Sequence, residues 1–363
     1  MPNQSTIAIP TFLAKLGITH PILQAPMAGV STPAMAAAVS NAGGLGALGL
    51  GAMNAQAAKE VIAATRALTD KPFNVNVFCH APAKIDVAVS QAWLAYLAPT
   101  FQEFDVPVPS TLREIYQSFL VDTAMFEMLL AEKPAVISFH FGLPSSEQIA
   151  AFKTAGITLL ATATSITEAT AITEAGLDAI VAQGIEAGGH RGMFDPSAAD
   201  SELPTLDLVR ELKQVSHLPI IAAGGLMNGA DIAQAFAVGA DAVQLGTAFV
   251  TTPESAADAA YRAAFFQQPV LPTTLTKSIS GRPARGFCNQ LTALGEQPNA
   301  PTIPDYPLTY DAGKALHAAA KGKGNVAYAA QWAGMSAAKA RNLSAATLIN
   351  TLVEELIAAQ AGN

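Results

Sequence analysis

The residue best suited to chemistry by its type and surroundings is His190, in the segment EAGGHRG. The glycines beside it leave room for the imidazole to approach a ligand closely, and Arg191 adds positive potential. An imidazole at such a position can donate a hydrogen bond to an anionic group or take up a proton. A lone histidine is more often a structural group, so this assignment depends on where the fold places it.

Two short segments have the features of a phosphate site. Gly224–Gly225 lets backbone N–H groups approach an anion closely, and the helix expected to start near Asn228 adds its positive end. Gly246–Thr247 offers further amides and a hydroxyl. The alternative is that these glycines only form tight turns. This alternative is less favoured if the fold brings both loops to one place.

Residues 44–49, GLGALG, fit the pattern G-x-G-x-x-G of dinucleotide-binding loops. That pattern requires a strand before it and a helix directly after it. Here a helical stretch precedes the glycines, and they run into a strand. We therefore interpret the segment as a helix-to-strand turn.

Eight short apolar or β-branched runs alternate with alanine-rich stretches typical of helices. The expected strands are Ile22–Met27, Leu45–Leu50, Phe73–Phe78, Ala135–Phe141, Ile157–Thr164, Ala179–Gln183, Pro219–Ala223 and Ala242–Phe249. The expected helices include Thr32–Ala42, Ala55–Leu68, Ser145–Ala155, Ser165–Ala175, Thr205–Val215 and Gly229–Val238. Eight βα units predict an α/β protein with a (β/α)8 TIM barrel rather than an open doubly wound sheet.

The barrel prediction brings the candidate residues together, because active sites of such barrels lie at the C-terminal ends of the strands. His190 follows the sixth expected strand, Gly224–Gly225 the seventh and Gly246–Thr247 the eighth. His140, on the fourth strand, is a weaker candidate for the wall of the same site.

Two segments fall outside the repeat. We expect the barrel to cover residues 1–252, with a helical insertion at about 80–133. Residues 253–363 have no βα period and are expected to form a smaller, mostly helical cap at the C-terminal face of the barrel. For the last helix, Ala345–Ala359, one of the expected positions is packed against the barrel wall.

Part of this C-terminal region has the residues of a lid. Tyr306, Tyr310 and Lys314 are four residues apart, which places them on one face if the stretch is helical. The segment SGRP, which starts at Ser280, is a further candidate for the lid. The alternative for the two tyrosines and the lysine is a solvated helix face.

Composition excludes several classes of protein. Hydrophobic residues make up 51% of the chain and charged residues 13%, so a large core is expected rather than disorder. The net charge of −8 and the absence of a basic stripe argue against a nucleic-acid partner. The two cysteines, Cys79 and Cys288, match neither a metal nor a disulfide framework.

Targeting signals are also missing from the sequence. The uncharged stretch Ala34–Met53 is too weakly apolar for a membrane helix, and the N-terminus lacks the pattern of a signal peptide. We therefore expect a soluble cytoplasmic protein without a membrane partner.

Four motifs together resemble a known family. QAPMAGVSTPAMAAAVSNAGGLG, FNVNVFCH, SFHFGLP and AQGIEAGGHRG resemble the signature segments of class I nitronate monooxygenases. The resemblance implies FMN as cofactor, without a metal or NAD. Carried over to this chain, it implies a set of cofactor-binding residues: Ala25, Met27, Asn74, Asn76, Gln183, Gly188, Gly189, Gly224, Gly225, Gln244, Leu245, Gly246 and Thr247.

The amides in this set suit a flavin. Asn74 and Asn76 point to the same side of their strand, with Asn76 nearer the mouth, and Gln183 ends the sixth strand. Amide groups there can match the donor and acceptor edge of an isoalloxazine ring. The alternative is polar packing inside the barrel, which is less favoured because buried amides need specific partners.

The activity that the resemblance implies is the oxidation of alkyl nitronates with O2, with propionate 3-nitronate as the expected substrate and His190 as the catalytic residue. His140, Ser280, Tyr306, Tyr310 and Lys314 are the candidates for substrate contact. One alternative is an NAD(P)H-dependent quinone or enoyl reductase on the same FMN barrel. Another is a non-catalytic barrel that binds a phosphate ligand. Either a monomer or a homodimer is compatible with the sequence.

Overall fold

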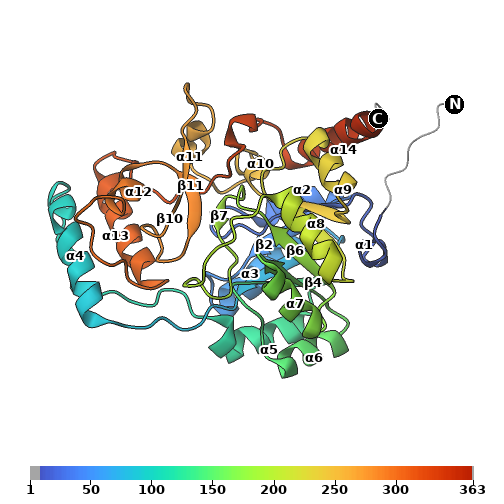
Figure 1. Cartoon of the computed structure of the whole chain (residues 1–363), viewed down its shortest axis with the longest axis horizontal. Coiled ribbons are helices and arrows are strands. Elements are labelled where there is room, and N and C mark those ends of the chain that lie inside the picture. Colours follow the sequence, from blue (N-terminus) through green and yellow to red (C-terminus); the bar gives the residue numbers. More distant parts are fainter. Residues whose placement is uncertain (1–8, 362–363) are drawn as a thin grey trace.

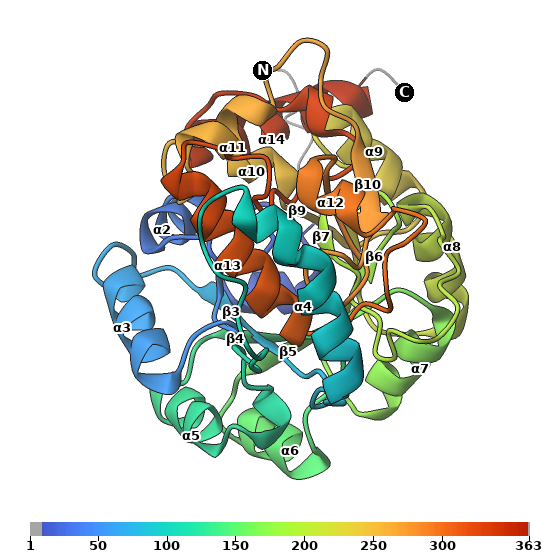
Figure 2. The same cartoon turned by 90° about the vertical axis from the view of Figure 1, so that its left-hand side faces the viewer.

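The computed structural model describes residues 9–361. The first eight residues, which carry most of the N-terminal sequence examined for a signal peptide, lie outside the described residues. Figures 1 and 2 show a barrel of strands and helices with a second layer of helices and loops over one end. No helix in the described part of the chain is long and apolar enough to cross a membrane.

The barrel has the eight parallel strands predicted from the sequence, in the order β1-β9-β8-β6-β5-β4-β3-β2. A parallel bridge between Leu23 and Leu45 joins β1 to β2 and closes the sheet. The prediction of a TIM barrel is confirmed. The strands are β1 (Ile22–Gln24), β2 (Gly46–Gly49), β3 (Phe73–Phe78), β4 (Val136–His140), β5 (Thr158–Ala163), β6 (Ala179–Gln183), β8 (Ile220–Ala223) and β9 (Ala242–Leu245).

The first and last strands are shorter than predicted. β9 ends at Leu245, and the apolar residues after it form the short helix α10 (Thr247–Val250). β1 ends at Gln24, whereas the expected strand continued to Met27. The cause is the same at both places, because a short buried apolar run does not by itself distinguish a strand from a turn or a buried helix.

Helices cover the outside of the barrel in the expected positions. They are α2 (Pro33–Asn41), α3 (Ala55–Arg66), α5 (Thr123–Glu132), α6 (Ser146–Thr154), α7 (Ile166–Glu174), α8 (Thr205–Val215) and α9 (Gly229–Ala237). Ser145, Ser165 and Asn228 each accept a backbone N–H bond as N-caps, as their residue types predicted. One hydrophobic layer fills the space between strands and helices, and a second fills the barrel interior.

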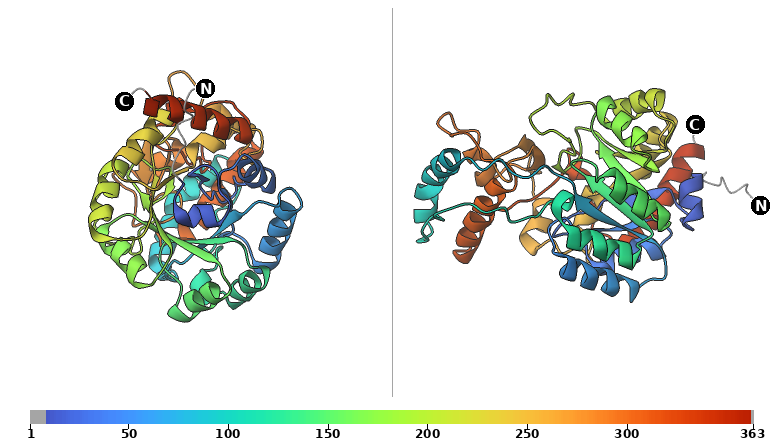
Figure 3. Two further views of the ribbon diagram at one scale, coloured as in Figure 1. Left: turned by 90° about the vertical axis from the view of Figure 1, so that its right-hand side faces the viewer. Right: turned by 90° about the horizontal axis from the view of Figure 1, so that it is seen from below.

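Two terminal helices complete the barrel. The short helix α1 (Thr11–Lys15) packs Leu13 into the interior layer at the end opposite the cap (Figure 3, left). The last helix, α14 (Ala345–Ala361), lies against α9 and α2 on the barrel wall. Glu355 of α14 forms an ion pair with Arg341 at 2.6 Å, and its other oxygen accepts the Gly229 N–H bond at 2.9 Å.

The cap is built from two segments far apart in the sequence. Its helices are α4 (Val87–Gln102), α11 (Ala259–Ala264), α12 (Gln290–Leu294) and α13 (Leu308–Gly322), with short 3-10 turns η1 (Phe119–Val121) and η2 (Ala337–Lys339) nearby. Trp93 and Leu97 of α4 share one hydrophobic cluster with Leu316 and Ala320 of α13. The insertion after β3 therefore packs against the C-terminal region (Figure 2).

The cap also contains strands that the expectation of a mostly helical region missed. β10 (Thr273–Thr276) and β11 (Ala284–Phe287) form an antiparallel pair, and β11 pairs in turn with β7 (Gly189–His190) from the barrel. His190 lies opposite Ala284 in this sheet, so it belongs to a short strand rather than to a free loop. A strand of two residues has too little sequence pattern to predict, because its partner is distant in the chain.

Candidate active site

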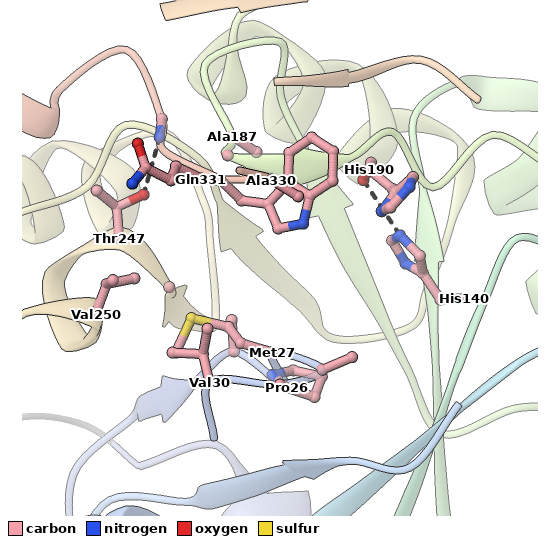
Figure 4. Close-up of a pocket in the computed structure, with 18 of the residues that line it drawn as sticks. Pro26, Met27, Val30, His140, Ala187, His190, Thr247, Val250, Ala330 and Gln331 are labelled. Carbon is pink, nitrogen blue, oxygen red and sulfur yellow. Dashed lines mark hydrogen bonds between the residues drawn. The ribbon is translucent and has the colours of Figure 1, made fainter. Parts of the chain in front are cut away.

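A cavity of about 630 Å³ lies where the barrel meets the cap, at the C-terminal ends of the strands (Figure 4). Most of the residues predicted from the sequence line it. These are Ala25, Met27, Asn76, His140, Gln183, Gly188, Gly189, His190, Gly224, Gly225, Gln244, Leu245, Gly246, Thr247, Tyr306, Tyr310 and Lys314. Asn74 and Ser280 are not among the lining residues.

The two predicted glycine loops face the same part of the cavity. Gly224 and Gly225 have φ values of 129° and 72°, a region that residues with a side chain rarely adopt. The Thr247 hydroxyl accepts a hydrogen bond from the Gly334 N–H at 3.0 Å, which leaves its own proton for a ligand (Figure 4). The loops therefore offer backbone and hydroxyl donors without a side chain in the way.

The contribution of helix α9 to a phosphate site stays a prediction. Two of its N-terminal N–H groups are bonded to side chains of the protein: Gly229 donates to Glu355, and Asp231 donates to the N-cap Asn228. The Asp231 carboxylate in turn accepts the Met227 N–H bond at 2.9 Å. Both carboxylates are themselves paired with cations, Asp231 with Lys339 and Glu355 with Arg341, so the charges at this end of α9 are balanced within the protein.

His190 is enclosed by other side chains. Its Nε2 lies 2.8 Å from the Ser280 hydroxyl oxygen, and Ser280 is fully buried. The ring centroid lies 5.0 Å from that of Trp332 and 5.6 Å from that of Tyr306. Burial is the largest cause that lowers the pKa of His190 to about 3, and Coulomb interactions with His140, Arg282 and His80 lower it further. The imidazole is therefore neutral near pH 7.

Two predicted pocket residues hold the backbone of His190 in place. His140 donates from Nε2 to the His190 carbonyl at 3.2 Å and accepts from the Thr162 hydroxyl at Nδ1 at 3.0 Å. Gln183 donates to the same carbonyl at 2.9 Å, and its own oxygen accepts the Gly192 N–H bond at 2.7 Å. The oxygen acceptor and one donor of Gln183 are thus used within the protein.

The two asparagines of β3 lie at different depths. Both donate to the Ser138 hydroxyl oxygen at 2.9 Å, and Asn76 also donates to the Ser138 carbonyl at 3.0 Å. Asn76 lines the cavity, and its amide oxygen is left to accept a bond from a ligand. Asn74 is 1% exposed and lies one layer below, so the structure does not place it at the cofactor as predicted.

The cap supplies an aromatic wall and a cation. Tyr310 and Lys314 lie on α13, whereas Tyr306 precedes the helix and is almost fully buried. The Lys314 Nζ lies 5.0 Å from the ring centroid of Tyr116 and 5.3 Å from that of Tyr310. Among the described residues, no carboxylate comes within 4.0 Å of this ammonium group.

Several lining residues were not predicted from the sequence. The segment 329–334 contributes Gln331 and Trp332, and the insertion after β3 contributes Tyr116. The Trp332 ring is the aromatic ring closest to His190 by centroid distance. These residues belong to segments with no periodic pattern, so only their aromatic content could have drawn attention to them.

The cavity is large enough for a cofactor-sized ligand. A Cβ atom on Gly246 would lie 3.3 Å from the Ala25 Cβ and 3.8 Å from the Met27 sulfur, so this glycine keeps the space between the loops open. The volume is in the range of pockets that hold a cofactor-sized ligand. In the described part of the chain, no group of three His, Cys, Asp or Glu side chains could hold a metal ion.

Comparison with known proteins places this site in a family. The model of the family described as nitronate monooxygenase matches residues 10–355. A nitronate monooxygenase of Paraburkholderia phytofirmans is 59% identical over 344 residues, which cover 95% of this chain and 94% of that protein. A nitronate monooxygenase of Pseudomonas aeruginosa is 53% identical over 345 residues, 95% of this chain and 98% of that protein.

Solved structures agree with the fold. A nitroalkane oxidase from Streptomyces ansochromogenes superimposes with a TM-score of 0.89 at 37% identity, over 97% of this chain and 99% of that one. FabK from Thermotoga maritima superimposes with a TM-score of 0.73 at 27% identity, over 98% of both chains. Both similarities extend through the barrel and the cap.

Proposed function

We propose, from the premise that the chain belongs to the nitronate monooxygenase family, that it oxidises alkyl nitronates with O2 and uses FMN as cofactor. The observation that carries this proposal is the neutral, enclosed imidazole of His190, which lies in one cavity with two glycine loops and with Lys314, a lysine that has no carboxylate partner among the described residues. These groups suit a small anion held beside a phosphorylated cofactor.

The residues that would hold FMN come from several strand ends. Gly224–Gly225 and Gly246–Thr247 would donate to the phosphate, and Asn76 would accept from the ring system. Met27 and Gly188 would lie along the cofactor. When bound, the flavin supplies the electron-transfer chemistry, and the protein supplies position and charge.

His190 would act as a neutral hydrogen-bond donor to the oxygens of the nitronate. A nitronate is already a carbanion equivalent, so its oxidation requires no strong base. A base whose pKa lies near 3 is poorly matched to removing a proton from carbon. The site is therefore better suited to nitronates than to neutral nitroalkanes.

Lys314 supports a substrate with a second negative group. Its ammonium lies on the wall of the cavity, and it is held over two tyrosine rings rather than by a carboxylate. A carboxylate at the far end of the substrate would accept from Lys314 and from a tyrosine hydroxyl. Propionate 3-nitronate has this arrangement of charges. The monomeric or dimeric state and the cytoplasmic location stay predictions from the sequence.

One experiment separates the proposal from the reductase alternative. The FMN-loaded protein is mixed without oxygen with propionate 3-nitronate and, in a second vessel, with NADPH, and the flavin absorbance is followed. We expect bleaching by the nitronate and formation of nitrite once air is admitted. Bleaching by NADPH alone would contradict the proposal and favour the reductase.

A further inference from the structure

A buried arginine lies behind one wall of the cavity. Arg282 is 3% exposed and follows Ser280 in a turn whose middle residue, Gly281, has a φ of 93°. Its Nη2 donates to the Met193 carbonyl, but its Nε has no hydrogen-bond partner among the described residues. No carboxylate of the described chain lies within 4.0 Å of the guanidinium group.

Such an arrangement is costly for the folded protein. Burying a cation without an anionic partner removes its hydration, and one carbonyl bond does not compensate for that loss. The carboxyl groups of Glu168, Asp195 and Asp305 act on Arg282 through longer-range Coulomb attraction.

Only one ring separates this charge from the cavity. The guanidinium carbon lies 4.2 Å from the ring centroid of Phe141, and Phe141 lines the cavity, whereas Arg282 does not. The Phe141 ring lies 5.7 Å from the ring of His190 and 5.6 Å from that of Tyr306. An anion bound beside His190 would therefore lie within reach of the arginine's field.

We propose that Arg282 is a positioning residue that makes the site selective for anions, because its buried charge acts through the Phe141 wall on a ligand held at His190. This inference rests on the proposed function. Ser280 links the two parts, since its hydroxyl contacts His190 at 2.8 Å and its oxygen accepts the Arg282 backbone N–H bond at 3.4 Å.

The lowered pKa values of the neighbouring histidines are consistent with a positive electrostatic potential at the site. The other groups around His190 are His140, His80, Tyr306 and Tyr310. The charge of Arg282 contributes to lowering the pKa of His80, His140 and His190, although burial is the larger cause for each. A field that disfavours protonated histidines favours a bound anion by the same Coulomb interaction.

The rival explanation is structural, since Arg282 also stacks on Phe141 and bonds to Met193. Two variants separate charge from packing. Arg282→Met removes the charge and keeps an apolar stem, a type of change that buried sites often tolerate. Arg282→Lys keeps the charge and loses the planar stacking. Arg210→Met, on the exposed side of α8, is the matched control for the loss of one positive charge.

The test compares an anion with a neutral ligand in the FMN-loaded proteins. Nitrate binding is followed by the change in flavin absorbance, and neutral nitroethane is measured as a competitor of nitrate. We expect Arg282→Met to weaken nitrate binding roughly 10-fold, as a charge at about 8–10 Å would in a partly buried site. Nitroethane binding should stay within about threefold of the wild type by the same reasoning, and Arg282→Lys should keep the preference for nitrate.

Two results would overturn the inference: equal losses for nitrate and nitroethane in Arg282→Met, or unchanged nitrate binding. If Arg282→Met does not retain FMN, the Arg282→Lys variant tests the inference instead. This variant keeps the positive charge, so loss of its preference for nitrate over nitroethane would also contradict the inference. Nitrate binding does not depend on turnover. If the protein does not oxidise nitronates but Arg282→Met selectively loses nitrate binding, only the proposed function is contradicted. The inference about Arg282 then still holds.

Discussion

The imidazole of His190 lies among Ser280 and four aromatic rings, and these neighbours limit what it can do. Position and residue type were sufficient to predict it as the candidate catalytic group. Its neutral state was not predictable, because that state depends on burial and on His140, Arg282 and His80, which are distant in the sequence. The sequence alone left open whether His190 acts as a base or only as a hydrogen-bond donor.

The His190→Asn variant tests the donor role. Asparagine keeps a hydrogen-bond donor but loses the imidazole geometry and the contact with Ser280. We expect kcat/KM for a nitronate to fall on the order of 10- to 100-fold, which corresponds to roughly 1.4 to 2.7 kcal/mol of transition-state stabilisation. His217→Asn, at an exposed position after α8, is the control and should leave kcat/KM unchanged. Unchanged nitronate kinetics in a flavin-loaded His190→Asn protein would remove His190 from the site.

Buried histidines also determine how the protein responds to acid. Burial lowers the pKa of His80 and His140 to about 4 and that of His190 to about 3, below the ordinary value of 6.5. The unfolded chain therefore binds more protons than the folded one between about pH 6.5 and 3, and the free energy of unfolding rises with pH in that window. Stability is lost as the pH falls below 6.5.

His80 is the most direct place to test this dependence. It is 1% exposed, and neither ring nitrogen has a hydrogen-bond partner among the described residues. We expect His80→Gln to reduce the slope of unfolding free energy against pH between pH 6.5 and 4, measured by urea titration at each pH. The exposed His217→Gln should not change that slope. A slope in His80→Gln equal to that of the wild type would mean that His80 is not buried in its neutral form.

At the scale of elements, the glycine loops after β8 and β9 are one part of the predicted site that lines the cavity. Both lie on the cavity, and the positive φ values at Gly224 and Gly225 explain the choice of glycine there. The helix α9 behind them was expected to help bind a phosphate, and Glu355 of α14 accepts the bond of its first N–H group, that of Gly229. That contact joins residues 126 positions apart, which no local pattern can indicate.

The Gly225→Asp variant tests the phosphate loop. A carboxylate there would repel a phosphate dianion, and the side chain would enter the space that the glycine leaves open. We expect loss of FMN with the fold retained, measured by flavin absorbance per protein and by circular dichroism. Gly239→Asp is the control, because Gly239 also has a positive φ, 103°, but does not line the cavity. Stoichiometric FMN in Gly225→Asp would show that the phosphate binds elsewhere.

At the scale of the whole molecule, the cavity exists only because two distant segments cover the barrel mouth. Trp93 of α4 and Leu316 of α13 pack in one cluster, and the β7–β11 pairing joins the barrel to the cap next to His190. The barrel follows from a repeated local pattern, so the sequence was sufficient to predict it. The cap depends on non-local pairing of short, irregular segments, which explains why Tyr116 and Trp332 were not predicted.

This closed architecture also determines which flavin the protein can hold. The two glycine loops would provide one phosphate-binding region, and residues 44–49 do not form a dinucleotide-binding loop, because they lead into β2 rather than into a helix. The ADP half of FAD would need a second phosphate site and an adenine pocket. We expect the purified protein to be yellow and to release FMN on denaturation, identified by chromatography against FMN and FAD standards. Phosphodiesterase treatment should leave the released flavin unchanged, because only FAD contains the cleavable pyrophosphate. Recovery of FAD, or of no flavin after reconstitution with FMN, would contradict the cofactor assignment while leaving the barrel itself unaffected.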